Sequence, residues 1–279
     1  MPVWICAACA VEHPDTAEPP TRCRICNDER QYVPMSGQSW TTLERLGAAG
    51  TQLTIVEVEP NLFGISEHPQ VGIGQRAHLI RTAGGNLLWD PTGFVDEAGA
   101  EQVRALGPVA AIVASHPHMY GVQVEWSRAL GGVPVLVSEA DREWVQRPDA
   151  AVEFFGGDFF SGDHEVVPGV TLRTPGGHFP GSVVAYWSEG AEGRGVLLSG
   201  DTIFPGPDGK WVSFMRSYPN NIPLSIAVVD RVARATNAHP FDRIYGNFGG
   251  VIPTDAQAVV RRSADRQMSW MRGDFDDLT

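Results

Sequence analysis

The chain has 279 residues, 43% hydrophobic and 19% charged, which suits one large domain or one domain with a small appendage. Its formal net charge of -12 and pI of about 5.0 repel a phosphate backbone, so nucleic acid is not an expected partner. No apolar run reaches the roughly 18 residues of a membrane helix, and no basic segment of a secretory signal opens the chain. We therefore expect a cytoplasmic protein whose cysteines form no disulfides.

The first segment of the chain carries all four cysteines, in two Cys-x-x-Cys pairs formed by Cys6 with Cys9 and Cys23 with Cys26. Each pair can direct two sulfurs at one ion, a pattern strongly associated with tetrahedral zinc. The segment is too short to bury a core, so a metal would have to supply its folding free energy. We predict a zinc-ribbon-like segment over residues 1–35 with a closed, structural zinc site. A redox pair and four free thiols are the alternatives.

The remainder, residues 36–279, is predicted to be one domain that is strand-rich at first and then mixes strands with helices. Its first helices and strands are predicted from the alternation of apolar residues and from Gly and Pro residues, which favour turns between them. We expect a short helix near Thr41–Leu46, a longer one at Asp96–Leu106, strands at Thr51–Val58, Gln75–Thr82 and Asn86–Asp90, and a loop at Asn61–Gly74.

The middle of the domain contains an apolar strand that begins at Val109 and ends at His116-Pro117-His118. Pro117 removes a backbone donor and stops the strand, so both imidazoles should lie on a loop at its C-terminal edge. Ligands bind at that edge in open α/β sheets. The pair is therefore either half of a metal site or two ordinary loop histidines.

The later elements are predicted in the same way. We expect helices at Val122–Leu130, Glu139–Gln146, Pro223–Thr236 and Thr254–Met271, strands at Pro134–Ser138, Val183–Trp187, Val196–Ser199 and Arg243–Tyr245, and short strands over 150–175 with turns at Gly156-Gly157, Gly162 and Pro168-Gly169.

Two further loops can complete a metal site. His178 lies between glycines and a proline, where a tight backbone lets the side chain project. Asp201 follows an apolar strand, and a carboxylate buried there is costly unless a metal or another partner compensates it.

Together, these motifs resemble the metallo-β-lactamase fold superfamily over roughly residues 50 to 270. The matching motifs are Asp90-Pro91-Thr92-Gly93, His116-Pro117-His118, Gly177-His178-Phe179-Pro180-Gly181 and Gly200-Asp201. The resemblance implies a four-layer αββα sandwich of the α+β class, with the metal site on one edge of the two sheets.

The chain departs from the family pattern at its second metal site. The family motif His-x-His-x-Asp-His ends here in Tyr120 and Gly121, and the late Gly-His-Gly turn corresponds to Tyr245–Gly249, which has no histidine. The resemblance implies that His116, His118, His178 and Asp201 hold one metal, zinc or alternatively iron, while the second site is lost.

The expected function is hydrolysis of a small carbonyl substrate, such as a thioester, ester, lactone or lactam. One zinc with three nitrogen ligands would lower the pKa of its bound water to about 7. Tyr120 could donate to a developing oxyanion, and Asp90 could orient the water or support a histidine.

The loop after Asp201 offers Arg216, Tyr218 and Asn220 either as substrate contacts or as packing residues. A small molecule is the expected partner, and association with a second copy stays open.

Two other functions remain as alternatives. His116, His178 and Asp201 also form the two-histidine, one-carboxylate set of non-haem iron(II) enzymes, and the persulfide dioxygenases of this fold resemble it. A catalytically inactive binding module is the second alternative. A β-lactamase itself is less expected, because the sequence shows no export signal.

Overall fold

The computed structural model describes residues 1–156 and 162–279. Two sheets form its centre. The first runs in the order β10 (Val152–Phe155), β9 (Val135–Ser138), β8 (Val109–Val113), β7 (Asn86–Trp89), β6 (Ala77–Ile80), β5 (Leu62–His68) and β4 (Gln52–Glu59). The second runs β11 (His164–Val167), β12 (Val170–Arg173), β13 (Val184–Trp187), β14 (Val196–Leu198), β19 (Arg243–Tyr245) and β20 (Val251–Ile252).

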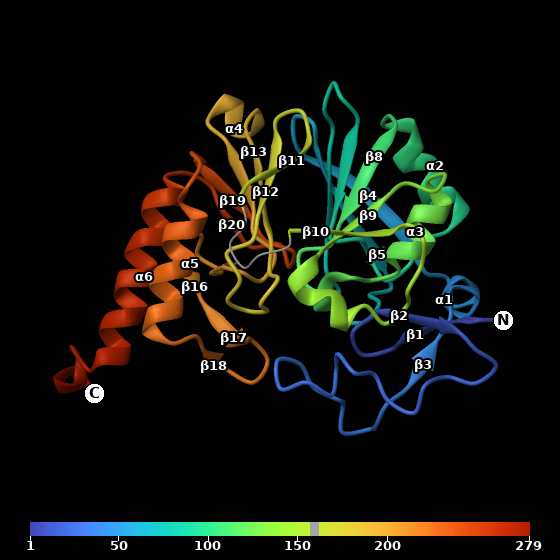
Figure 1. Cartoon of the computed structure of the whole chain (residues 1–279), viewed down its shortest axis with the longest axis horizontal. Helices are drawn as coiled ribbons and strands as arrows, with labels where there is room; N and C mark the ends of the chain where they lie inside the picture. The colour runs from blue at the N-terminus through green and yellow to red at the C-terminus, as the bar shows by residue number, and fades with distance from the viewer. Residues whose placement is uncertain (157–161) are drawn as a thin grey trace.

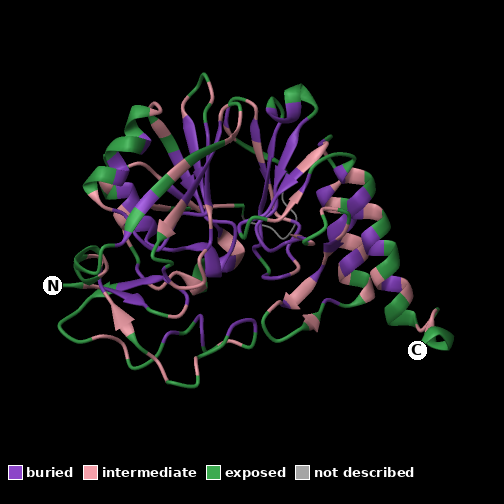
Figure 2. Ribbon diagram, turned by 180° about the vertical axis from the view of Figure 1, so that it is seen from behind, coloured by how far each residue is buried: buried purple, intermediate pink, exposed green. Residues whose placement is uncertain are grey.

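The two sheets pack face to face and helices cover their outer faces (Figure 1). One buried cluster joins Leu87 and Trp89 of the first sheet to Leu172 and Leu198 of the second. Buried strands therefore lie in the middle of the molecule, while the helices expose one side (Figure 2). The arrangement is the expected αββα sandwich.

The outer helices begin and end where local sequence permits. Beside the first sheet lie α1 (Leu43–Ala48), α2 (Glu97–Ala105) and α3 (Gln123–Ala129), and beside the second lie α5 (Ile226–Thr236) and α6 (Ala256–Arg272). The Asp96 side chain caps α2 by accepting from the Gly99 N–H at 2.8 Å. Helix α5 buries Val229, Val232 and Ala233, the spacing of one helix face.

Short elements connect these layers. They are the helical turns η1 (Pro117–Met119), α4 (Gly190–Gly193), η2 (Glu139–Trp144) and η3 (Asp276–Leu278), and the paired strands β15 (Phe204–Pro205) with β16 (Val212–Ser213) and β17 (Met215–Ser217) with β18 (Ile222–Pro223). No helix of the described ranges is long and apolar enough to cross a membrane.

One sequence prediction was wrong. Asn61–Gly74 was expected to be a loop, but Leu62–His68 is strand β5, paired with β4 and β6. Leu62 and Ile65 are fully buried, so burial outweighs the local glycine and proline content. Gly64 fits there because a Cβ would lie 2.8 Å from the Arg76 side chain, which crosses it. The predicted turn at Gly156-Gly157 falls partly outside the described residues.

A third, small sheet organises the N-terminal segment. Strand β1 (Val3–Cys6) pairs with β2 (Glu12–Asp15) and with β3 (Trp40–Thr41), so the sheet uses residues on both sides of residue 35. Buried residues of the segment, including Ile5 and Ile25, share one core cluster with those of the first sheet and its helices. The segment therefore packs as an additional part of the sandwich's first half.

Candidate metal centres and active site

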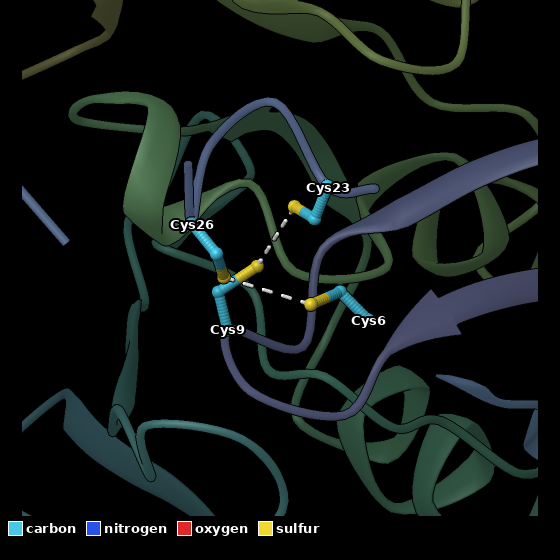
Figure 3. Close-up of side chains that lie close together, drawn as sticks. All are labelled: Cys6, Cys9, Cys23 and Cys26. Atoms are coloured by element: carbon cyan, nitrogen blue, oxygen red, sulfur yellow. Dashed lines mark hydrogen bonds between the residues drawn. The ribbon is translucent and has the colours of Figure 1, made fainter. Parts of the chain in front are cut away.

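The four cysteines form one buried cluster (Figure 3). Cys6 Sγ lies 3.6 Å from Cys26 Sγ, and Cys9 Sγ lies 3.7 Å from Cys23 Sγ, too far apart for disulfides. A tetrahedral zinc about 2.3 Å from each sulfur would place neighbouring sulfurs about 3.8 Å apart. The observed spacing therefore fits a four-thiolate metal site.

The surroundings of this cluster act differently on the four thiols. Gln38 bridges the two pairs, since its Nε2 donates to Cys6 Sγ at 3.2 Å and its Oε1 accepts from the Cys23 N–H at 3.0 Å. Hydrogen bonds from the neighbouring thiols, that of Cys26 first, lower the pKa of Cys23. The hydrogen bond to Cys23 is the largest of the effects that raise the pKa of Cys9 and Cys26. Thiolate is the form that binds metal.

The second cluster joins three histidines and an aspartate from separate parts of the chain. His116 and His118 flank Pro117 in η1 after β8, His178 follows β12, and Asp201 follows β14. All four side chains are buried, and one ligand atom from each lies within 4.8 Å of the others.

The individual distances show how the ligand atoms converge. His178 Nε2 lies 3.2 Å from His118 Nδ1 and 4.0 Å from Asp201 Oδ2, and His116 Nε2 lies 3.5 Å from the same Asp201 oxygen. Three nitrogens and one carboxylate oxygen in this space form a donor set suited to zinc.

Hydrogen bonds behind the cluster set the orientation of two imidazoles. His178 Nδ1 lies 3.2 Å from the Met215 carbonyl oxygen, to which it can donate. His116 Nδ1 lies 2.9 Å from Ser115 Oγ, which in turn donates to Asp90 Oδ2 at 2.9 Å. Asp90 Oδ1 also accepts from the Ser115 N–H at 2.6 Å. These contacts leave Nε2 of each imidazole free toward the cluster.

The electrostatics of the cluster also suit metal binding. Burial lowers the pKa of His178 to about 3 and that of His118 well below its ordinary value, so both imidazoles are neutral. Burial opposes ionisation of Asp201, but the His116 and His178 imidazoles lower its pKa overall. Within the described residues, His116 Nε2 and Asp201 Oδ1 are buried and lack a hydrogen-bond partner. A bound cation would satisfy these atoms.

A pocket of about 330 Å³ opens onto this cluster. His118, His178 and Asp201 form one side of it. Gln31 and Tyr32 from the N-terminal segment form another, and the remaining lining residues are Gln70, Gly72, Ile73, Phe204, Tyr218, Pro219 and Phe248. A larger hollow of about 590 Å³ shares Phe204 and Phe248 with it but contains none of the metal-binding candidates.

The structure separates the three residues predicted in the loop after Asp201. Tyr218 lines the pocket, and its hydroxyl, which has one proton to donate, lies 3.2 Å from the backbone oxygen of Asp201 and 3.1 Å from that of Ser213. Arg216 instead pairs with Glu29 at 2.6 Å, and Asn220 Nδ2 donates to the Glu29 carbonyl at 2.8 Å.

The two residues suggested for catalysis are not among the described residues that line the pocket. Tyr120 is buried, its hydroxyl donates to the Asp141 carbonyl at 3.3 Å, and it is not among the described residues that line the pocket. Asp90 contacts His116 through Ser115, and burial raises the pKa of its carboxyl to about 7.

Several pocket residues were missed by sequence reasoning. Gln31, Tyr32, Gln70, Ile73 and Phe204 belong to no chemical motif, and only their place in the fold brings them to the pocket. A signal existed for Phe248, because it lies in the stretch that corresponds to the family's late histidine turn.

Comparisons with known proteins identify the family of the chain. The model of the metallo-beta-lactamase superfamily matches residues 72–268. Uncharacterized protein YmaE of Bacillus subtilis (strain 168) is 42% identical over 276 residues, which cover 99% of each chain.

Solved structures share the fold at low sequence identity. The metallo-beta-lactamase FIM-1 from Pseudomonas aeruginosa, in its mono-zinc form, has a TM-score of 0.55 and 14% identity and covers 77% of this chain and 96% of its own. A metallo-beta-lactamase from Hirschia baltica has a TM-score of 0.54 and 16% identity and covers 76% and 96%. By its matched segment and its fold, the chain belongs to the metallo-beta-lactamase superfamily.

Proposed function

We propose that this protein is a metal-dependent hydrolase of a small carbonyl substrate, a thioester, ester, lactone or lactam. The observation that carries the proposal is the convergence of His116, His118, His178 and Asp201, of which the last three line an open pocket. When bound, a metal ion supplies a Lewis acid that polarises a carbonyl and lowers the pKa of a coordinated water.

The residues of this chain orient the metal ligands and position the substrate. Ser115 and the Met215 carbonyl hold His116 and His178 in the orientation that faces the cluster. Asp201 stays ionised beside the imidazoles and can accept a proton or orient a water. The pocket walls position the carbonyl group beside the cluster.

Local packing supports one metal here rather than two. Gly121 stands where the family motif has its last histidine, and a Cβ there would lie 2.3 Å from the Pro91 carbonyl oxygen. Asn247, in the stretch of the late turn, donates its amide to the Arg76 carbonyl at 3.1 Å. The nitrogen-rich donor set favours zinc over iron, since a third imidazole, His118, adjoins the two-histidine, one-carboxylate set.

The test is a substrate panel for the purified full chain, with an ester, a thioester, a lactone and a lactam. We expect turnover of at least one class, reduced at least about 100-fold in His178→Ala, because loss of a ligand should exceed the loss from an outer hydrogen bond. Ser188→Ala, a surface change, is the control. Oxygen consumption with a persulfide would favour the iron alternative, and a metal-loaded chain inert toward every class would contradict the proposal.

A further inference from the structure

The N-terminal segment is docked onto the rim of the pocket by contacts far apart in sequence. Asn220 Nδ2 donates to the carbonyls of Glu29 (2.8 Å) and Gln31 (3.1 Å). Ser217 Oγ donates to the Arg30 carbonyl at 3.1 Å, and Arg216 pairs with the Glu29 carboxylate at 2.6 Å. Three consecutive residues of the segment are thus held by their backbone or side chains.

Arg30 extends this docking behind the metal-binding candidates. Its guanidinium lies 4.1 Å from the centre of the Phe179 ring, and that ring lies 5.0 Å from the His118 ring. Arg30 also pairs with Asp28 at 3.0 Å within the segment. The residue is buried, so this stacking fixes the direction in which the chain continues to Gln31 and Tyr32.

The four-cysteine cluster holds the other end of the docked stretch. The N–H of Asn27 donates to the Cys23 carbonyl at 3.1 Å, and the N–H of Asp28 donates to the Ile25 carbonyl at 3.3 Å. The stretch 29–32 therefore begins only a few residues from Cys26 and is fixed on both sides.

Gln31 and Tyr32 then form a wall of the pocket. Tyr32 is 52% exposed although it is a large aromatic residue, and Phe248, another lining residue, is 39% exposed. Exposed aromatic side chains at the mouth of a pocket are typical of ligand contacts. Among the described residues, no lysine or arginine lines this pocket, so no such side chain there can pair with an anionic group away from the metal-binding candidates.

We propose that Gln31 and Tyr32 are substrate-contacting residues that determine specificity, and that the group seated against them is uncharged and apolar or aromatic. Asn220 is a positioning residue that holds this wall, and the four-cysteine cluster anchors it. The inference rests on the proposed function, since it assigns the substrate class of the same pocket.

The test measures binding and does not require turnover. The probes are acetohydroxamate, benzohydroxamate and 4-carboxybenzohydroxamate, which share a metal-binding head, and calorimetry on the metal-loaded full chain gives each Kd. We expect benzohydroxamate to bind the tightest of the three. Tyr32→Ala should weaken benzohydroxamate roughly 3- to 10-fold, the range of an aromatic contact, and leave acetohydroxamate unchanged.

Three further variants distinguish the effect of the position of Gln31 and Tyr32 from a nonspecific effect of substitution on the protein. Tyr32→Phe should retain the preference, because it keeps the ring. Asn220→Ala should lose the preference with unchanged metal content and unchanged acetohydroxamate affinity. Met35→Ala, a fully exposed change in the same segment, should behave as wild type.

The outcomes distinguish failure of the inference from failure of the proposed function. If Tyr32→Ala weakens both neutral probes equally, or neither, the wall does not select the substrate although the metal-binding pocket stands. If 4-carboxybenzohydroxamate binds tightest, the uncharged class is wrong. If no hydroxamate binds the wild-type protein, the metal-binding pocket is itself overturned, and the inference with it.

Discussion

The Ser115 hydroxyl contributes to the orientation of His116 in the site. It links the buried Asp90 carboxyl to His116 Nδ1 through contacts of 2.9 Å on each side. The backbone bond from Ser115 to Asp90 does not depend on the hydroxyl, so removing the hydroxyl isolates its role.

We predict that Ser115→Ala weakens zinc binding at the histidine site about 10- to 100-fold, because His116 loses the contact that orients its ring. Chelator competition measures the affinity, and Ser188→Ala serves as the control. An affinity equal to wild type would mean that packing alone orients His116.

Gly121 occupies the position at which the family motif has its last histidine, and its surroundings leave no room for a side chain. Its φ of 51° lies in the left-handed region, and a Cβ would lie 2.3 Å from the Pro91 oxygen and 2.5 Å from the Thr92 oxygen. Gly131 has a φ of 93° but no atom within 4 Å of such a Cβ. Substitution of Gly131 therefore tests backbone strain alone, whereas substitution of Gly121 tests backbone strain together with close packing.

Gly121→Ala should lower the free energy of unfolding by clearly more than Gly131→Ala, which should cost about 1–3 kcal/mol for the positive φ alone. Urea unfolding of both variants measures the difference. Equal losses would show that the backbone around Pro91 moves easily, and would weaken the packing argument against a second metal.

At the scale of single elements, β5 shows the limit of local sequence patterns. Most strands were located because they are continuous apolar runs, as in Val183–Trp187 and Val109–Val113. Strand β5 contains Gly64 and Glu67, which are not typical of a buried strand, although it pairs with a neighbouring strand on both sides. Pairing partners are distant in sequence, so no local pattern could place it.

Glu67 on β5 makes stability depend on pH. Burial raises the pKa of its carboxyl to about 8, against opposing hydrogen bonds from the Gly93 and Phe94 backbone. The folded state therefore retains a proton that the unfolded state releases near pH 4.5. The contribution of Glu67 to stability is full below pH 4.5 and is lost as the pH rises from there to about 8.

Glu67→Gln should remove this loss. We predict that the free energy of unfolding of the variant, relative to that of wild type, increases by on the order of 2 kcal/mol from pH 4.5 to pH 9. This value is reduced for the partial exposure of the side chain. Denaturant unfolding at both pH values measures it, with the exposed Glu153→Gln as control. A parallel pH profile in wild type and variant would contradict the assignment.

At the scale of the whole molecule, the N-terminal segment and the sandwich form one packed unit. Buried Glu12 pairs with buried Arg147 at 2.6 Å, and its other oxygen accepts from the Val124 N–H at 2.5 Å. Ala10 lies so close to Gly72 and Gly93 that a Cβ on either glycine would collide with it. Removing the cysteine site should therefore affect more than the segment itself.

The double variant Cys6→Ser/Cys9→Ser should lower Tm by roughly 10 °C or more in a single cooperative transition, because the metal's folding energy supports a shared core. Differential scanning calorimetry measures it, with Met35→Ala as control. An unchanged main transition preceded by a small separate one would show that the segment folds independently.

The metal-binding candidates could be predicted from sequence, whereas the pocket could not. The spacing of the two Cys-x-x-Cys pairs indicated a metal site, and His116, His118, His178 and Asp201 were identified because their motifs, in chain order, resemble those of the superfamily. The wall formed by Gln31 and Tyr32 depends on contacts between residues such as Glu29 and Arg216, which are 187 positions apart. Such contacts follow from the assembled fold and leave no pattern in the sequence.

The most direct test of the central claim, one metal at each of two sites, is metal content per chain by elemental mass spectrometry. The wild-type protein should contain two metal ions. His116→Ala/His178→Ala should contain one, which Cys6→Ser/Cys9→Ser should lose while keeping the other. If the histidine double variant retains the full metal content of the wild type, the cluster of His116, His118, His178 and Asp201 holds no metal, and the proposed hydrolase is contradicted.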